Sequence, residues 1–272
     1  MDLPAYLQRI DYHGPREATL PVLSGIVLRH ACSIAFENID AYLGQRVSLD
    51  PAAVEHKLVR GARGGWCFEQ NLLLGAALRA LGFEVTDLAA RVLWNRPADA
   101  ITARTHRLLQ VRVDGGNWLV DAGFGGQTLT GVLDMDSEAA QPTPHEPFRL
   151  RRAGGDRVLE SQVRGEWLPL CRFDLQPQLP VDFEAANFQL VHDPASHFTQ
   201  ALVVSLATPL GRHVLRANEL AFHAIDGGTR RESIAGSAAL LAALREVFAI
   251  TPPDPAGLAA KFERQTGSAA RS

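Results

Sequence analysis

The sequence predicts an α+β protein in which helices come first, antiparallel strands follow, and the last part mixes both. Apolar residues at helical spacing dominate residues 1–85. Short alternating or β-branched runs, separated by glycine-rich turns, continue to about residue 180. After residue 200, short strand-like runs give way to amphipathic stretches. Because helices and strands are segregated along the chain, we expect three regions, at residues 1–85, 86–200 and 201–272.

Two helices are predicted in the first region. Apolar residues that would share one face of the earlier helix are Leu20, Leu23, Ile26, Val27 and Ala31. A second apolar helical pattern begins at Phe68 and continues to Leu81. Gly82 then occupies the position expected for a C-terminal cap, so we expect this helix to end there.

The middle region is predicted to be antiparallel β structure. Its strands are expected at residues 83–92, 107–113, 118–120, 158–163 and 167–173. Glycine pairs mark turns between them, as in Asp114-Gly115-Gly116. Residues 182–197 are predicted to form a connection with a short helix.

The last region is predicted to combine three strands with two helices. The strands are expected at residues 202–206, 212–216 and 219–225, with a turn at Asp226-Gly227-Gly228. The helices are expected at residues 237–248 and 255–265.

Charge and cysteine content narrow the function classes. The 272 residues carry a formal net charge of −3, and no block of like charges suggests a nucleic acid or an anionic membrane as partner. The apolar runs fall short of the ~18 residues of a membrane span, and the N-terminal segment lacks a signal-peptide pattern. Three irregularly spaced cysteines, Cys32, Cys67 and Cys171, argue against a disulfide framework. We therefore expect a cytoplasmic protein.

Cys67 is the candidate nucleophile. Residues 63–69 read Arg-Gly-Gly-Trp-Cys-Phe-Glu, which places Cys67 between a glycine pair and a predicted helix start. Unpaired N–H groups at a helix start stabilise a thiolate, and the two glycines would leave room for a substrate. The alternative for any free cysteine is a small buried apolar side chain, and we assign Cys32 and Cys171 to the core on that basis.

A histidine and an aspartate in the following hairpin are candidates to activate the thiol. His106 lies near the start of one strand and Asp121 at the end of the next. A nucleophile needs a base, and the base needs an orienting group. With a turn over residues 114–117, however, the two residues would be offset by about four positions, roughly 13 Å, so contact would require a bulge or a looser turn. A satisfied half-buried histidine and a turn-capping aspartate remain as alternatives.

Other candidate sites carry weaker signals. Gly123, Gly125 and Gly126 surround Phe124 in a loop that could offer backbone N–H groups to a pyrophosphate, although the pattern is not a recognised phosphate-binding motif. Residues 36–40 fit a loop that ends a helix. His192 and His197 are five positions apart without a cysteine or acid to complete a zinc set, so no metal is expected.

The motifs together resemble those of the arylamine N-acetyltransferases over nearly the whole chain. Residues 63–69 match the family's Arg-Gly-Gly-x-Cys-Phe-Glu signature, with Trp66 at the variable position. The other similar segments are residues 6–12, 36–40, 71, 78, 81–83, 105–106 and 121–125. Many bacterial members have two aromatic residues and then small hydroxyl residues after the asparagine, whereas residues 187–191 read Asn-Phe-Gln-Leu-Val, which leaves the acceptor preference open.

The resemblance implies a fold and a catalytic triad. The fold would be a helical bundle (1–85) that carries the nucleophile, an antiparallel β-barrel with a connecting segment (86–200), and an α/β lid (201–272), around a cysteine-protease-like core. Cys67 would be the nucleophile, His106 the base and Asp121 the group that orients the base.

The resemblance also implies a reaction. Acetyl-coenzyme A would donate an acetyl group through an acetyl-cysteine, with ping-pong kinetics, to xenobiotic arylamines and arylhydrazines and to the oxygen of arylhydroxylamines. Phe36 and Phe124 would contact the acceptor, and Gly125 and Gly126 would contact coenzyme A. Two alternatives are an amide synthase of the same fold and a papain- or transglutaminase-like cysteine hydrolase, although the papain-like cysteine pattern is absent.

Overall fold

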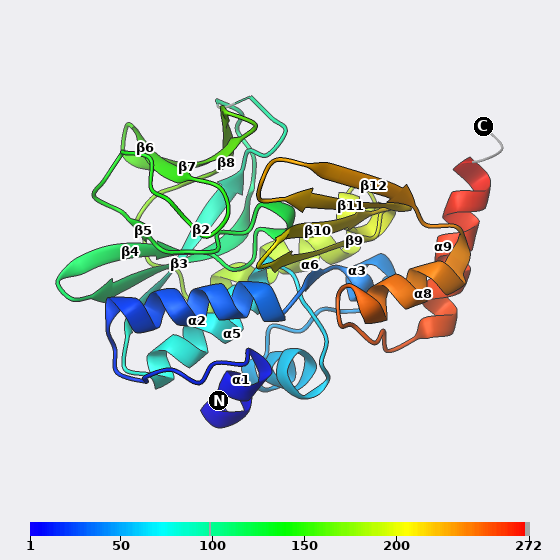
Figure 1. Cartoon of the computed structure of the whole chain (residues 1–272), viewed down its shortest axis with the longest axis horizontal. Coiled ribbons are helices and arrows are strands. Elements are labelled where there is room, and N and C mark those ends of the chain that lie inside the picture. The colour runs from blue at the N-terminus through cyan, green and yellow to red at the C-terminus, as the bar shows by residue number, and fades with distance from the viewer. Residues whose placement is uncertain (98, 270–272) are drawn as a thin grey trace.

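Helices make up the N-terminal part of the computed structural model (Figure 1), which describes residues 1–97 and 99–269. They are α1 (Leu3–Arg9), α2 (Leu20–Ser33), α3 (Ile39–Tyr42), α4 (Pro51–Glu55), a π-helical turn η1 (His56–Arg60) and α5 (Cys67–Ala80). Both predicted helices are confirmed. The apolar stripe of α2 is buried, and Gly82 follows the end of α5 with a φ of +90°, which glycine adopts without strain.

Helix α5 is the central element of this part of the chain. Helices α1, α2 and α4 pack against it, and so do two strands of the barrel, β2 (Glu84–Val92) and β3 (Arg104–Val113). As a result α5 is buried along most of its length. Its first turn, which begins at Cys67, therefore lies where the helices meet the barrel.

The middle of the chain forms a seven-stranded antiparallel sheet in the order β5-β4-β3-β2-β8-β7-β6. The remaining strands are β4 (Gly116–Val120), β5 (Leu133–Asp134), β6 (Phe148–Ala153), β7 (Asp156–Val163) and β8 (Glu166–Phe173). The outer strands β5 and β6 approach each other, so the sheet is a nearly closed barrel. The five predicted strands are confirmed, whereas β5 and β6 were not expected from the sequence.

The turn between β3 and β4 is tighter than expected. Val113 pairs with Gly116, so the turn consists of Asp114 and Gly115 alone. Both have positive φ, 52° and 75°, the combination that a two-residue hairpin turn requires. This register would set Asp121 opposite Leu108 if the pairing continued past β4. His106 and Asp121 are then offset by two positions, and the expected offset of four was wrong.

The C-terminal part contains a second, five-stranded sheet in the order β1-β9-β10-β11-β12. Its strands are β1 (Phe36–Glu37), β9 (Val203–Thr208), β10 (Gly211–Arg216), β11 (Glu219–Ala224) and β12 (Thr229–Ser233), followed by α8 (Gly236–Glu246) and α9 (Pro255–Ala269). The three predicted strands and two predicted helices are confirmed. Residues 36–40 were expected to be a loop, but Phe36 and Glu37 pair with β9 and residue 39 begins α3.

The connection between the two sheets runs back over the helices. It contains the 3₁₀ turn η3 (Pro180–Phe183), α6 (Glu184–His192) and α7 (His197–Gln200). Figure 1 shows the barrel and the second sheet side by side above the N-terminal helices, with α8 and α9 at the far end. The α+β prediction is confirmed by this arrangement.

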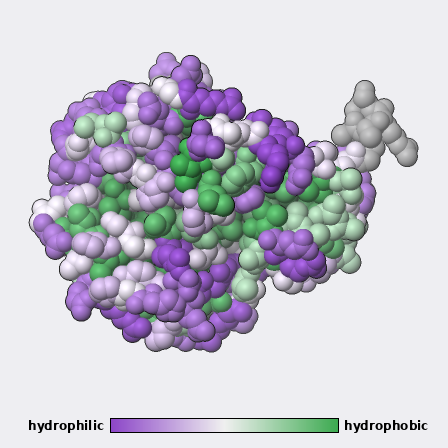
Figure 2. All heavy atoms as spheres, viewed as in Figure 1, coloured by the Kyte–Doolittle hydropathy of each residue, from purple (hydrophilic) through white to green (hydrophobic). Residues whose placement is uncertain are grey.

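Figure 2 shows one face of the molecule, on which hydrophilic and hydrophobic residues are unevenly distributed. Figure 2 shows polar residues over the barrel and the helices, with apolar residues gathered near the middle of this face, between the barrel and the second sheet. Within residues 1–97 and 99–269, no helix is both long enough and apolar enough to cross a membrane.

Candidate active site

Cys67 is the first residue of α5, as the sequence predicts. Trp66 precedes it in extended conformation, and the Trp66 N–H donates to Glu69 Oε2 at 3.1 Å. This bond satisfies a backbone donor at the helix start and fixes the turn that presents the thiol. Cys67 is only 6% exposed, and its Sγ lies 3.6 Å from the carbonyl oxygen of Thr105, the residue before His106.

Gly64 and Gly65 serve close packing. Neither has a positive φ. A Cβ atom on Gly64 would lie 2.1 Å from the carbonyl oxygen of Ala35, and one on Gly65 would lie 2.7 Å from Glu69 Oε2. The expectation that the pair leaves room for a substrate was therefore wrong, because the protein itself fills the space beside both residues.

His106 and Asp121 are in direct contact. The His106 Nε2 lies 2.6 Å from Asp121 Oδ2, and both side chains are almost completely buried. Contact is possible because Asp121 lies just past the end of β4, where the chain leaves the strand ladder. Burial lowers the pKa of His106, but the charge of Asp121 and its hydrogen bond outweigh burial and, with a smaller contribution from the Cys67 thiol, raise the pKa to about 10. The imidazolium is therefore the favoured form at neutral pH.

The second carboxylate oxygen of Asp121 is also fully engaged. Oδ1 accepts one hydrogen bond from Asn71 Nδ2 at 2.9 Å and another from the Gly123 N–H at 2.9 Å. The sequence assigned no role to Asn71. Its spacing, four residues after Cys67, was the available signal, because positions four apart share one face of a helix.

Gly123 must be small for the site to form. A Cβ atom on this residue would lie 2.7 Å from the Cα atom of Cys67 and 2.9 Å from Asn71 Nδ2. The loop after β4 therefore packs directly on the backbone of the first turn of α5. This close approach brings the segments that hold Cys67 and Asp121 together.

Phe124 follows Gly123 in this loop, and Phe36 lies beside the loop at Gly125. The Phe124 ring meets the His106 ring edge-on, with centroids 5.2 Å apart. A Cβ atom on Gly125, whose φ is +81°, would lie 3.5 Å from the Phe36 ring. Gly125 and Gly126 begin the 3₁₀ turn η2 (Gly125–Gln127), which packs against β1, β9 and β10. Phe124 thus contacts His106 directly, and Phe36 lies in one apolar cluster with Cys67.

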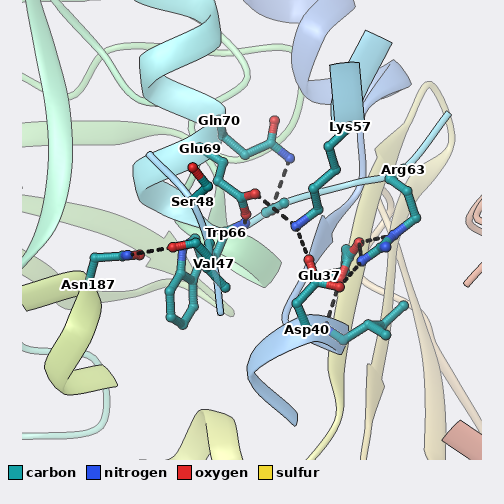
Figure 3. A network of polar contacts seen from close by, with 12 residues as sticks. Glu37, Asp40, Val47, Ser48, Lys57, Arg63, Trp66, Glu69, Gln70 and Asn187 are labelled. Carbon is teal, nitrogen blue, oxygen red and sulfur yellow. Dashed lines mark hydrogen bonds and ion pairs between the residues drawn. The ribbon is translucent and has the colours of Figure 1, made fainter. Parts of the chain in front are cut away.

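A buried network of charged groups supports the start of α5 (Figure 3). Lys57 Nζ lies 2.8 Å from Glu69 Oε1 and 2.7 Å from Asp40 Oδ2, so it stands between the two carboxylates. Arg63 pairs with Asp40 at 2.8 Å and with Glu37 at 2.7 Å. Burial lowers the pKa of Lys57, but the charges of Glu69, Glu37 and Asp40 outweigh it, so the net shift is upward. The network ties η1, β1 and α3 to the segment that carries Cys67.

The other two cysteines lie in different surroundings. Cys171 is fully buried in β8, and burial raises its pKa far above the ordinary thiol value. Burial also raises the pKa of Cys32 in α2. A raised pKa disfavours the reactive thiolate, so Cys67 is the thiol in the position suited to nucleophilic chemistry.

The side chains at the site form a set suited to acyl transfer. They are a thiol at a helix start, an imidazole favoured in its charged form, and a buried carboxylate. Such a set can activate sulfur for attack on a carbonyl group. No group of three or more histidine, cysteine, aspartate or glutamate side chains in the part of the chain that the structure describes could hold a metal ion.

Comparisons with known proteins show which proteins the chain is similar to. A model of the N-acetyltransferase family matches residues 19–253. An arylamine N-acetyltransferase of Mycolicibacterium smegmatis is 44% identical over 261 residues, covering 94% of each chain. A protein of Salmonella typhimurium, named arylamine N-acetyltransferase / N-hydroxyarylamine O-acetyltransferase, is 40% identical over 216 residues, covering 79% of this chain and 76% of its own. The structure of Mycobacterium marinum arylamine N-acetyltransferase in complex with CoA superposes with a TM-score of 0.93 at 38% identity, covering 97% of this chain and 99% of that one.

Proposed function

Because the chain belongs to the arylamine N-acetyltransferase family, an acyltransferase family, we propose that it transfers acetyl groups from acetyl-coenzyme A to aromatic amines and hydrazines through an acetylated Cys67. The observation that carries the proposal is the placement of Cys67 at a helix start beside the His106–Asp121 pair. The bound CoA of the Mycobacterium marinum protein supports the choice of donor.

In the first half of the reaction, the Cys67 thiolate attacks the thioester carbonyl of acetyl-coenzyme A. A carbon–sulfur bond to Cys67 forms and the bond to coenzyme A breaks. His106, charged at neutral pH, gives its proton to the departing sulfur. The N–H of Cys67, at the first position of α5, has no partner within the helix and is suited to bind the developing oxyanion.

In the second half, the acceptor nitrogen attacks the acetyl-cysteine. The neutral imidazole left by the first half takes a proton from the nitrogen, and Cys67 leaves as a thiolate. Asp121 holds the His106 Nε2 proton throughout, so that Nδ1 is the nitrogen that exchanges protons. The acetylated acceptor is then released, and the enzyme returns to its starting state.

The binding roles follow from the same site. Phe36 and Phe124 would lie against the aromatic ring of the acceptor, and the backbone N–H groups of Gly125 and Gly126 would face coenzyme A. The name of the Salmonella typhimurium relative supports O-acetylation of arylhydroxylamines as a further reaction. Three free cysteines fit a reducing compartment such as the cytoplasm.

The decisive experiment is to incubate the protein with acetyl-coenzyme A without an amine and to map the acetyl group by peptide mass spectrometry. We expect one acetyl group on the peptide that contains Cys67. Cys67→Ala should lose both the label and turnover while remaining folded. Acetylation on Cys32 or Cys171 instead would contradict the assignment.

Kinetics separate the alternatives. A covalent intermediate requires coenzyme A to leave before the amine reacts, so double-reciprocal plots should give parallel lines when donor and amine are varied together. Robust peptide hydrolysis without an acetyl donor would favour the cysteine hydrolase. Intramolecular amide closure of a carrier-bound chain, with no acetylation of free arylamines, would favour the amide synthase.

A further inference from the structure

Asn71 joins the three segments that carry the proposed triad. It lies on α5, four residues after Cys67, and is completely buried. Its Nδ2 donates to the carbonyl oxygen of Arg107, which follows His106 on β3, at 2.5 Å. The same Nδ2 donates to Asp121 Oδ1, and Asn71 Oδ1 accepts the N–H of Ala122 at 3.1 Å. One side chain thus binds the residue after His106, the side chain of Asp121 and the backbone beside it.

These bonds fix the rotation of the Asp121 carboxylate. Oδ1 accepts from Asn71 and from the Gly123 N–H, so Oδ2 is left for His106 Nε2. The Gly123 N–H alone is a local bond within the loop, two residues from Asp121. The bond from Asn71 fixes the position of the carboxylate relative to α5, the helix that begins with Cys67.

We infer that Asn71 is a positioning residue for the acetyl transfer, which holds the Asp121 carboxylate and the strand of His106 in register with the Cys67 thiol. The inference rests on the proposed function, because it concerns the geometry of that triad. Asn71 touches no reacting atom. Its role is to keep the imidazole pointed at the sulfur, and a misplacement of about 1 Å at such a site lowers rates by about 100-fold.

Asn38 offers a matched control for the loss of such a buried amide. It is 3% exposed, its Nδ2 donates to the carbonyl oxygens of Phe198 and Ala201 at 2.7 and 2.8 Å, and its Oδ1 accepts the Val203 N–H at 2.7 Å. The bonding pattern equals that of Asn71, but no partner belongs to the triad. Asn71→Leu and Asn38→Leu therefore remove the same number of buried hydrogen bonds.

The experiment measures acetylation of Cys67 by acetyl-coenzyme A without an amine, in a single turnover at pH 7, for the full-length variants. We expect Asn71→Leu to acetylate about 100-fold more slowly than the wild type. Asn38→Leu, with comparable loss of stability, should stay close to the wild-type rate. If Asn71→Leu does not fold, Asn71→Ala, which leaves space for water, is measured in its place.

A second readout separates positioning from stability. In protein labelled with ¹⁵N-histidine, the Nε2 proton shared by His106 and Asp121 should give a downfield signal that is absent from His106→Gln. This signal should shift or disappear in the Asn71 variant and persist in Asn38→Leu. Equal acetylation rates for the two leucine variants, or an unchanged proton signal in the Asn71 variant, would overturn the inference. A wild-type protein that is not acetylated on Cys67 would instead refute the proposed function.

Discussion

The charge state of His106 depends mainly on Asp121, and this dependence should be visible in the free energy of unfolding. The pKa of His106 in the folded protein is about 10, above the ordinary value of 6.5. The ion pair therefore stabilises the fold fully below pH 6.5, and its contribution is lost as the pH rises toward 10. We predict that Asp121→Asn removes this contribution, so that the free energy of unfolding falls less between pH 6.5 and 10 than in the wild type. Urea unfolding at pH 6, 8 and 10 checks it, and equal pH dependence in both proteins would contradict it.

A second buried histidine, His30, should lower the folding stability at acidic pH instead of alkaline pH. His30 contacts Tyr6 Oη through Nδ1 and Gln70 Oε1 through Nε2, both at 2.8 Å. Because the Gln70 oxygen can only accept, Nε2 donates to it, and in the neutral ring Nδ1 accepts from the Tyr6 hydroxyl. The hydrogen bond to Gln70 raises the pKa of His30, but burial outweighs this effect and lowers the pKa from 6.5 to about 4.

Folding stability should therefore fall as the pH drops from 6.5 toward 4, because the unfolded chain binds a proton at His30 that the folded protein does not. The expected loss is about 3 kcal/mol. His30→Gln should flatten the stability profile in this range. His13→Gln, which changes a side chain that is 81% exposed, is the control and should leave the profile unchanged. Parallel profiles for the wild type and His30→Gln would refute the prediction.

The proposed triad residues were singled out from the sequence because their local contexts are distinctive, but the contact between His106 and Asp121 was not predicted. His106 and Asp121 meet because Asp114 and Gly115 make a two-residue turn and because Asp121 lies beyond the strand. The Asp-Gly pair is a known signal for such a turn, so the register was within reach of sequence reasoning. The spacing of Asn71 from Cys67 could place it on the same helix face, but its hydrogen bonds to β3 and to Asp121 after β4 could not be predicted from the local sequence.

At the scale of elements, the fit between the Cys67 segment and β1 depends on Gly64. The Gly65 N–H donates to the Ala35 carbonyl oxygen at 3.2 Å, and a Cβ atom on Gly64 would lie 2.1 Å from that same oxygen. A backbone atom cannot move aside as a flexible side chain can. We predict that Gly64→Ala lowers stability by about 3 kcal/mol or more, the upper end of the cost of overpacking, and lowers activity with it.

Gly155→Ala provides the matched control for this prediction. A Cβ atom on Gly155 would have no heavy atom of the described residues within 4 Å, and its φ is not positive. Its replacement should leave the melting temperature nearly unchanged. Thermal unfolding of both variants is the measurement, and a Gly64→Ala protein as stable as the wild type would show that β1 and the Cys67 segment are not held as closely as described.

Most elements could be predicted because each carries its own periodicity. The exceptions are informative. Strand β1 has two residues, too few for any alternation to appear, and it exists because Phe36 and Glu37 pair with β9, far away in sequence. Strand β12 is exposed throughout and therefore lacks an apolar face. In both cases the partner strand, which the local sequence does not reveal, determines the structure.

At the scale of the whole molecule, the barrel and the second sheet are joined by a charged pair. Arg212 on β10 and Glu146, just before β6, make two hydrogen bonds of 3.1 and 2.8 Å. Their side chains are 6% and 19% exposed. The preceding residue in the same loop, His145, contacts the carbonyl oxygen of Thr208 at the end of β9 at 2.9 Å. The loop therefore anchors one sheet to the other.

Removing the charge of one partner in this buried pair should lower the free energy of unfolding far more than the same change in a surface pair. Glu146→Gln leaves the Arg212 cation buried without a counter-charge, and we predict a loss of about 3 kcal/mol in the free energy of unfolding. Adding Arg212→Met should restore much of it, since the unpaired charge is then gone. The control is Glu84→Gln in the pair of Arg112 and Glu84, whose side chains are 61% and 65% exposed and whose loss should cost at most about 1 kcal/mol. A double-mutant cycle by urea unfolding measures the coupling between Arg212 and Glu146, and additive effects would mean that this pair does not help to hold the two sheets together.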